Sequence, residues 1–236
     1  MDTVLHRHLE LNQGEAIVAS GVRYAFSTRT AYDRVLKDIN LSVRHGEIVV
    51  LTGPSGAGKT TLLTLIGALR APQEGSIRTL GTEMNGLSGE GQRGIRRRIG
   101  FVFQDHNLFE ALTPAQTLKL TMELGGKRVA REEALQRSTA LLAQLGIESH
   151  LHARPRALST GQKQRVAIAR ALINDPPLVL ADEPTASIDR EAADAVLRLL
   201  RRRVSERGMS VLMVTHDERL FPIADRVVTM VDGRIA

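Results

Sequence analysis

Residues 53–60 combine types and spacing that suit phosphate binding. Glycines let backbone N–H groups curl around phosphate oxygens, and a helix that begins at this point would present its positive N-terminal end to the same anion. The lysine would reach the β- and γ-phosphates, and the threonine hydroxyl would ligate Mg²⁺. We therefore predict a nucleotide site here, with Thr61 directly after it. The segment fits the pattern G-x-x-x-x-G-K-[ST] and consists of Gly53, Pro54, Ser55, Gly56, Ala57, Gly58, Lys59 and Thr60.

Two adjacent carboxylates, Asp182 and Glu183, follow the apolar run 178–181. An acid at the carboxyl end of a strand next to a phosphate loop can hold Mg²⁺ through water. The next acid, which points elsewhere, can polarise an attacking water. A pair of acids after a strand is usually only a polar turn, so the functional interpretation depends on the phosphate loop upstream.

The elements that must position these residues alternate along the chain. Apolar runs with the length of buried strands occur at 48–51, 99–103, 178–181, 211–214 and 227–230. Segments with apolar residues at helical spacing are 60–69, 161–173 and 190–205. Buried strands that alternate with helices predict an α/β protein with a parallel sheet covered on both faces.

Near the N-terminus, the runs 17–24 and 38–43 predict an antiparallel β patch, with the polar residues 27–30 between them. Further along, Thr113 and Pro114 predict a helix N-cap followed by proline at the first helical position.

The mostly helical stretch that Thr113 opens interrupts the alternation of strands and helices, so we assign it to an inserted lobe. The expected organisation is a single domain of 236 residues. Its catalytic core, with the β patch, would comprise 1–104 and 159–236, and a helical subdomain would comprise 105–158.

Composition excludes several classes of protein. The absence of Cys excludes a disulfide scaffold and a cysteine-based zinc site. The formal net charge is +6, but aromatic residues are only 3%, so we interpret the basic runs 93–98 and 198–203 as solvated helix faces rather than a nucleic-acid interface. An anionic membrane surface would suit this charge equally well. Without a signal-peptide core or 18 consecutive apolar residues, the chain is expected to be cytosolic or peripheral.

Residues 158–172 carry a resemblance to a known family. Leu158-Ser159-Thr160-Gly161-Gln162 and the following segment 163–172 resemble the LSGGQ signature and helix of ATP-binding cassette (ABC) ATPases. Asp182-Glu183-Pro184-Thr185, a D-loop-like segment 186–189 and Thr215-His216-Asp217 extend the resemblance over nearly the whole chain. The resemblance implies a RecA-like P-loop NTPase core with an N-terminal antiparallel β subdomain and an inserted α-helical subdomain.

The resemblance also implies that the chain hydrolyses ATP with Mg²⁺. Gln104 matches the glutamine that contacts Mg²⁺ and the attacking water and senses a transmembrane partner, and His216 matches the histidine that contacts the γ-phosphate. The catalytic set would be Glu183, His216, Gln104 and Lys59, and the magnesium set Thr60, Gln104 and Asp182.

Other ATP contacts are implied in the same way. Tyr24 sits where the family places the aromatic residue that stacks on adenine, although it can also be an ordinary strand tyrosine. Ser159 and Gly161 would contact the γ-phosphate held by the opposite subunit, because two cassettes of this family sandwich two ATP molecules. Gln162 and Asp189 complete the set of residues that the resemblance places in contact with ATP. Hydrolysis would then require a homodimer.

Thr160 stands where the family usually has glycine. Its side chain is expected to restrict φ and to crowd the contact with the opposite subunit's phosphate. We expect a competent but slower site.

Three strings, 66–67, 99–108 and 180–185, resemble the branch that contains lipoprotein-release and macrolide-export ATPases. Within it, Thr160, Ala186 and residues 64–70 resemble most closely the DevA-type ATPases, associated with glycolipid export in cyanobacteria. This implies a peripheral subunit on the cytoplasmic face of the inner membrane that drives export of a lipid, lipoprotein or small hydrophobic molecule. Its partner would be a transmembrane permease. Further partners in this branch would be a periplasmic adaptor and an outer-membrane channel.

Two alternatives come from other functional classes. A cassette acting on nucleic acid or ribosomes is supported only by the net charge, and such relatives carry two cassettes or a long coiled-coil insertion. An ATP-dependent regulatory switch without transport is disfavoured by the presence of both Glu183 and His216.

Overall fold

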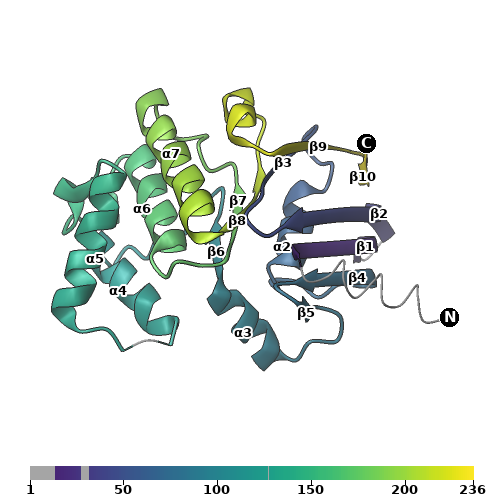
Figure 1. Ribbon diagram of the computed structural model, residues 1–236, viewed down its shortest axis with the longest axis horizontal. Helices are drawn as coiled ribbons and strands as arrows, with labels where there is room; N and C mark the ends of the chain where they lie inside the picture. The colour runs from purple at the N-terminus through teal and green to yellow at the C-terminus, as the bar shows by residue number, and fades with distance from the viewer. Residues whose placement is uncertain (1–13, 28–31, 127) are drawn as a thin grey trace.

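The computed structural model describes residues 14–27, 32–126 and 128–236. Its elements form layers, with an antiparallel sheet on one side, a second sheet through the middle and helices α4 to α7 on the other side (Figure 1). The predicted α/β architecture, with an antiparallel β subdomain and a helical part, is confirmed.

The central sheet has the strand order β10-β9-β3-β8-β7-β6. Its five strands from β9 to β6 are parallel, and only β10 runs antiparallel to its neighbour. The predicted parallel sheet is therefore present. Its strands are β3 (Ile48–Thr52), β6 (Ile99–Val102), β7 (Leu178–Asp182), β8 (Ser210–Val214), β9 (Arg226–Val231) and β10 (Arg234–Ile235).

Both faces of the central strands β3, β7 and β8 are buried, which explains why these strands are almost entirely apolar. On β3, Ile48 and Val50 join one hydrophobic cluster, whereas Val49 and Leu51 join another. The first cluster is completed by α4 to α7, and the second by α2 and the antiparallel sheet. Because side chains alternate along a strand, one short strand supplies both cores.

The helices of the core are α2 (Lys59–Ile66), α6 (Thr160–Leu172) and α7 (Arg190–Arg207). The first is shorter than the predicted 60–69. It ends at Gly67, and Ala68 has a φ of 55°, which is outside helical geometry. A helix boundary of this kind depends on backbone conformation that apolar spacing does not reveal.

The antiparallel sheet has the order β2-β1-β4-β5 and confirms the predicted β patch. Its strands are β1 (Glu15–Ser27), β2 (Tyr32–Arg44), β4 (Glu74–Thr79) and β5 (Thr82–Glu83). The first two are longer than predicted, and the last two were not predicted, since they are short and largely polar. Pairing of β1 with β2 shifts register at several points, one of them between Tyr24 and Ala25.

The helical stretch contains α4 (Pro114–Leu124), α5 (Arg131–Gln144) and the short 3₁₀ turns η1 (Glu148–His150) and η2 (Pro155–Ala157). Thr113 caps α4 through a reciprocal capping box with Gln116, and Pro114 follows it as predicted. These helices pack on each other and on α6, and α6 also contacts β6. The lobe is thus joined to the core through the helix that begins at the signature.

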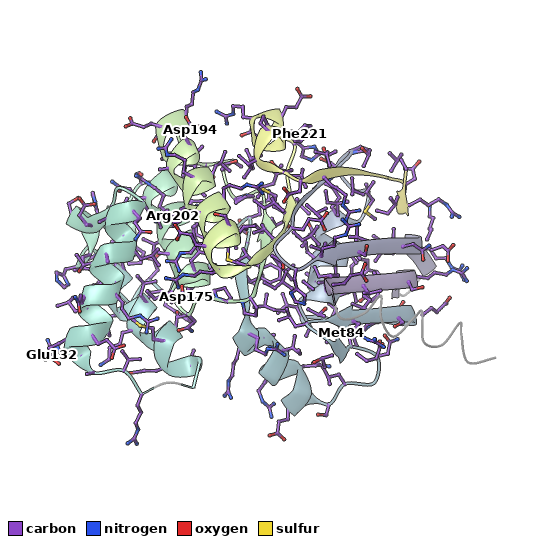
Figure 2. The ribbon with its side chains drawn as sticks, in the orientation of Figure 1. Met84, Glu132, Asp175, Asp194, Arg202 and Phe221 are labelled. Atoms are coloured by element: carbon purple, nitrogen blue, oxygen red, sulfur yellow. The ribbon has the colours of Figure 1, made fainter. Side chains whose placement is uncertain are left out.

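Basic side chains of α7 make contacts within the chain. Arg202 donates a 2.6 Å hydrogen bond to Gln144 Oε1, and Arg203 and Arg207 both pair with Asp175. Arg202 and Asp175 are labelled in Figure 2. On α3 (Gly89–Arg98), Arg96 donates to the carbonyl of Ala68. Over the ranges that the structure describes, no helix combines the length and apolar character needed to span a membrane.

Candidate functional site

A cavity of about 480 Å³ opens at the carboxyl ends of β3, β7 and β8. It gathers most of the predicted site from segments that are far apart in the sequence. Its polar lining consists of Ser55, Gly56, Gly58, Lys59, Thr60, Thr61, Gln104, Asp182, Glu183 and His216, with Phe26, Val35 and Val214 as apolar neighbours. The three remaining loop residues, Gly53, Pro54 and Ala57, shape the loop without lining the cavity.

The phosphate loop depends on glycine for its backbone path. Gly53 has a φ of 133°, and a Cβ atom there would lie 1.9 Å from Met230 O; Gly58 has a φ of 99° and precedes α2. No side chain caps this helix, so its first N–H groups are free to bind an anion.

Lys59 is nearly buried, and its Nζ donates to the carbonyls of Gly53 at 2.6 Å and Pro54 at 2.8 Å. Burial lowers the pKa of Lys59, while the carboxylates of Glu183 and Asp182 act in the opposite direction. The loop thus holds the ammonium group of Lys59 at the base of the cavity. Phosphate oxygens could replace the two carbonyls as acceptors of its hydrogen bonds.

Thr60 Oγ1 donates a 2.7 Å hydrogen bond to Asp182 Oδ2. Burial raises the pKa of Asp182, and the hydrogen bond from Thr60 and the charge of Lys59 partly oppose this effect. Gln104 lines the same cavity. A hydroxyl, a carboxylate and an amide are the hard oxygen donors that Mg²⁺ prefers, so the residues present fit the ion.

Glu183 adopts a φ of 48°, which is unusual for a residue other than glycine. Its N–H donates to Val214 O at 2.9 Å, and its Oε2 accepts a 3.1 Å hydrogen bond from Thr215 Oγ1. The other oxygen, Oε1, lies 3.7 Å from His216 Nε2. Backbone strain of this kind is typical of functional sites, and here it aims the carboxylate into the cavity beside the histidine.

The segment after His216 is fixed by an ion pair that sequence reasoning missed. Asp217 accepts hydrogen bonds of 2.7 and 2.6 Å from the guanidinium of Arg219, which holds the pKa of this carboxyl below its usual range. Its own N–H donates to Thr215 Oγ1 at 3.0 Å. The same hydroxyl therefore links this turn to Glu183.

Phe26 lines the cavity and Tyr24 does not, so stacking of Tyr24 on adenine stays a prediction. Tyr24 packs against a hydrophobic cluster and meets Phe26 edge-on, with ring centroids 5.2 Å apart. Gln73 fixes the strand between them, because it both accepts from Ala25 N at 2.8 Å and donates to Ala25 O at 3.0 Å. The only signal in the sequence was a second aromatic residue two positions after Tyr24.

The signature residues do not line this cavity. Ser159 is the N-cap of α6 and shares a reciprocal capping box with Gln162. Gly161 is close to the backbone of Ser187, since a Cβ atom would lie 2.9 Å from its carbonyl oxygen. Asp189 caps α7 by accepting from Ala192 N at 2.9 Å. Their contacts to ATP bound by an opposite subunit stay a prediction.

Thr160 is the exposed first residue of α6, and its φ is not positive. The expectation that a threonine would restrict φ at this point was wrong, because a helical conformation suits any residue except proline in the helix interior. Crowding of a phosphate from the opposite subunit stays a prediction.

Comparison with known proteins agrees with this geometry. Residues 36–186 match a family model described as ABC transporter. The chain is 45% identical over 217 residues to the lipoprotein-releasing system ATP-binding protein LolD of Anaeromyxobacter dehalogenans, covering 92% of this chain and 90% of that protein. It is 38% identical over 220 residues to the putative hemin import ATP-binding protein HrtA of Staphylococcus haemolyticus, covering 93% and 99%.

Among solved structures, the dimeric post-hydrolysis state of the ATP-binding cassette MJ0796 bound to ADP and Pi is similar, with a TM-score of 0.89 and 35% identity over 93% of this chain and 96% of that one. The predicted resemblance to lipoprotein-release ATPases is confirmed, whereas the finer likeness to DevA-type ATPases stays a prediction. The chain belongs to the ABC transporter family, in which it is an ATP-binding and ATP-hydrolysing subunit.

Proposed function

We propose that two copies of the chain close over two ATP molecules and thereby drive a separate membrane permease that exports a lipid, lipoprotein or small hydrophobic substrate. The observation that carries this proposal is the juxtaposition of Glu183 and His216 in the cavity that also contains Lys59 and the Thr60–Asp182 pair. One cavity thus combines phosphate binding, a magnesium donor set and a carboxylate that can act on water.

In the proposed reaction, Glu183 orients water for in-line attack on the γ-phosphate. Thr215 fixes one oxygen of Glu183, so the other is free to accept a hydrogen bond from that water. Lys59, His216 and the uncapped N-terminus of α2 stabilise the negative charge that develops on the phosphate oxygens. Mg²⁺ held by Thr60, Asp182 and Gln104 would supply further positive charge there.

Coupling to a permease would involve the loop after Gln104. Arg170, on the signature helix α6, donates to the carbonyls of Asn107 at 2.6 Å and His106 at 3.1 Å. This links the loop that begins at the nucleotide to the helix that would contact the opposite subunit's ATP. Closure of the dimer can therefore move the loop and whatever membrane segment docks on it, at the cytoplasmic face of the membrane.

Export is favoured by the identity to the lipoprotein-releasing protein, although the other relative is named as a putative hemin import protein. A permease with a large periplasmic domain, a periplasmic adaptor and an outer-membrane channel are the partners that the DevA-type resemblance implies.

The test is a pull-down of tagged Glu183→Gln protein from detergent-solubilised native membranes with ATP, beside Lys59→Ala as the control that cannot hold the phosphates. We expect a membrane subunit with a periplasmic domain to copurify. Recovery of ribosomes or nucleic acid without a membrane protein would contradict the proposal. A copurifying permease together with wild-type protein that turns over no ATP would favour the regulatory switch instead.

A further inference from the structure

Gln162 connects the signature serine to a histidine outside the signature. Ser159 N donates to Gln162 Oε1 at 2.8 Å, and Gln162 N donates to Ser159 Oγ at 3.2 Å. On its other side, Gln162 Nε2 lies 3.0 Å from His150 Nε2. The imidazole itself lies 3.0 Å, through Nδ1, from Ser149 Oγ.

The direction of each hydrogen bond follows from the chemistry of the groups. Ser159 N is a donor, so the oxygen of the Gln162 amide must face it, and the amide nitrogen must then face His150. An amide nitrogen only donates, which requires His150 Nε2 to accept. The two contacts of the imidazole are both hydrogen bonds in the tautomer that carries its proton on Nδ1, which faces the hydroxyl of Ser149.

The backbone around His150 is well anchored. Its N–H donates to Ile147 O at 3.0 Å, and its carbonyl accepts from Ala153 N at 3.0 Å. The next residue, Leu151, packs against the hydrophobic core and accepts a hydrogen bond from Ala115 N. By contrast, Ser159 is exposed at a helix end, where helices fray.

We propose that His150 is a positioning residue for the signature: it holds the Gln162 amide in the one orientation that fixes Ser159. The inference rests on the proposed function, because it matters for catalysis only if Ser159 contacts ATP bound by the opposite subunit. Without the acceptor at position 150, the Gln162 amide is free to rotate away and Ser159 loses the bond to its N–H.

The test uses variants that separate shape from hydrogen bonding. His150→Leu removes the acceptor, whereas His150→Gln keeps an oxygen at similar reach. His152→Leu is the matched control, since His152 is an exposed histidine two residues away. Thermal unfolding of each variant checks that the fold is retained.

The first measurement is hydrogen exchange of the Ser159 amide in the monomer. We expect exchange to speed up about three- to tenfold in His150→Leu, the size expected for loss of one hydrogen bond, and to remain near wild type in His150→Gln and His152→Leu. Unchanged exchange in His150→Leu would overturn the inference, whether or not the chain dimerises.

The second measurement is ATP-dependent dimerisation in the Glu183→Gln background, followed by light scattering. His150→Leu should raise the ATP concentration at the midpoint about three- to tenfold without changing nucleotide affinity of the monomer. In a Gln162→Ala background the same change should add nothing, because the two residues act through one contact. An additive effect, or an unchanged midpoint, would contradict a role through Gln162. Failure of Glu183→Gln itself to dimerise would instead contradict the proposed function, while the exchange result still decides whether His150 positions Ser159.

Discussion

Thr60 Oγ1 and Asp182 Oδ2 are joined by a hydrogen bond of 2.7 Å, although 122 positions separate them in the chain. This bond ties the first turn of α2 to the carboxyl end of β7. The bond joins the hydroxyl and the carboxylate that we propose as ligands of Mg²⁺, so it would keep these two groups together before nucleotide binds.

Titration of Asp182 should change the free energy of unfolding with pH. Its pKa is raised in the folded protein, so between the unfolded pKa and this higher value the folded state binds more protons. The contribution of Asp182 to the free energy of unfolding is therefore full below the unfolded pKa and is lost as pH rises through the folded one. Asp182→Asn should remove this loss of stability at rising pH. Urea unfolding curves of variant and wild type, recorded from pH 3.5 upwards in about half-unit steps, measure the difference. Parallel pH profiles would show that the buried carboxyl titrates normally.

Glu183→Gln should reduce the ATPase rate about 10²- to 10⁴-fold, the usual contribution of a general base. ATP binding should persist, because the loop around Lys59 is untouched. Turnover measured by phosphate release, with Glu218→Gln as an exposed control outside the cavity, checks this. A near-normal rate would remove Glu183 from its proposed role.

Phe26 and Tyr24 should differ in their effect on nucleotide affinity. Stacking of a base on an aromatic ring contributes about 1–3 kcal/mol, so Phe26→Ala should weaken ATP binding about 5- to 150-fold if this ring stacks on adenine. Tyr24→Ala should chiefly reduce stability, because that ring is partly buried against a hydrophobic cluster. Fluorescent-nucleotide titration and thermal unfolding separate the two effects. Weaker nucleotide binding in Tyr24→Ala alone would identify Tyr24 as the ring that stacks on adenine.

Two glycines of the phosphate loop should respond differently to alanine. At Gly53 the added Cβ would overlap Met230 O, which cannot move without disturbing β9, so Gly53→Ala should cost about 3 kcal/mol or more. At Gly56, where φ is also positive but no atom lies within 4 Å of the added Cβ, the cost should be about 1 kcal/mol. Chemical denaturation of both variants gives the comparison, and equal losses would exclude the backbone overlap as the cause.

Thr160→Gly should increase turnover a few-fold if the threonine side chain crowds the phosphate of the opposite subunit. Since Thr160 begins α6, the same change should lower stability by about 1 kcal/mol through the weaker helix propensity of glycine. Steady-state ATPase assays and thermal unfolding measure both quantities. Slower ATP turnover in Thr160→Gly would mean that the threonine side chain contributes to the nucleotide site.

The sequence alone determined the parts of the protein that depend on local patterns. Residues 53–60 revealed a phosphate loop because the N–H cradle requires glycine at fixed spacing. Continuous apolar runs revealed the parallel sheet, since strands buried on both faces cannot alternate with polar residues. Thr113 and Pro114 likewise predicted the start of a helix from residues that act within one turn.

Only the tertiary structure decided which distant groups meet. Phe26 lines the cavity and Tyr24 does not. Between them, the pairing of β1 with β2 shifts register and Gln73 holds the backbone of Ala25, and no local pattern in the sequence indicates either feature. His150 approaches Gln162 across a junction at which Arg165 of α6 donates to the carbonyls of Leu145 and Gly146, after the end of α5. Contacts of this kind depend on how whole elements pack, and residues far apart in the chain carry no local pattern that specifies them.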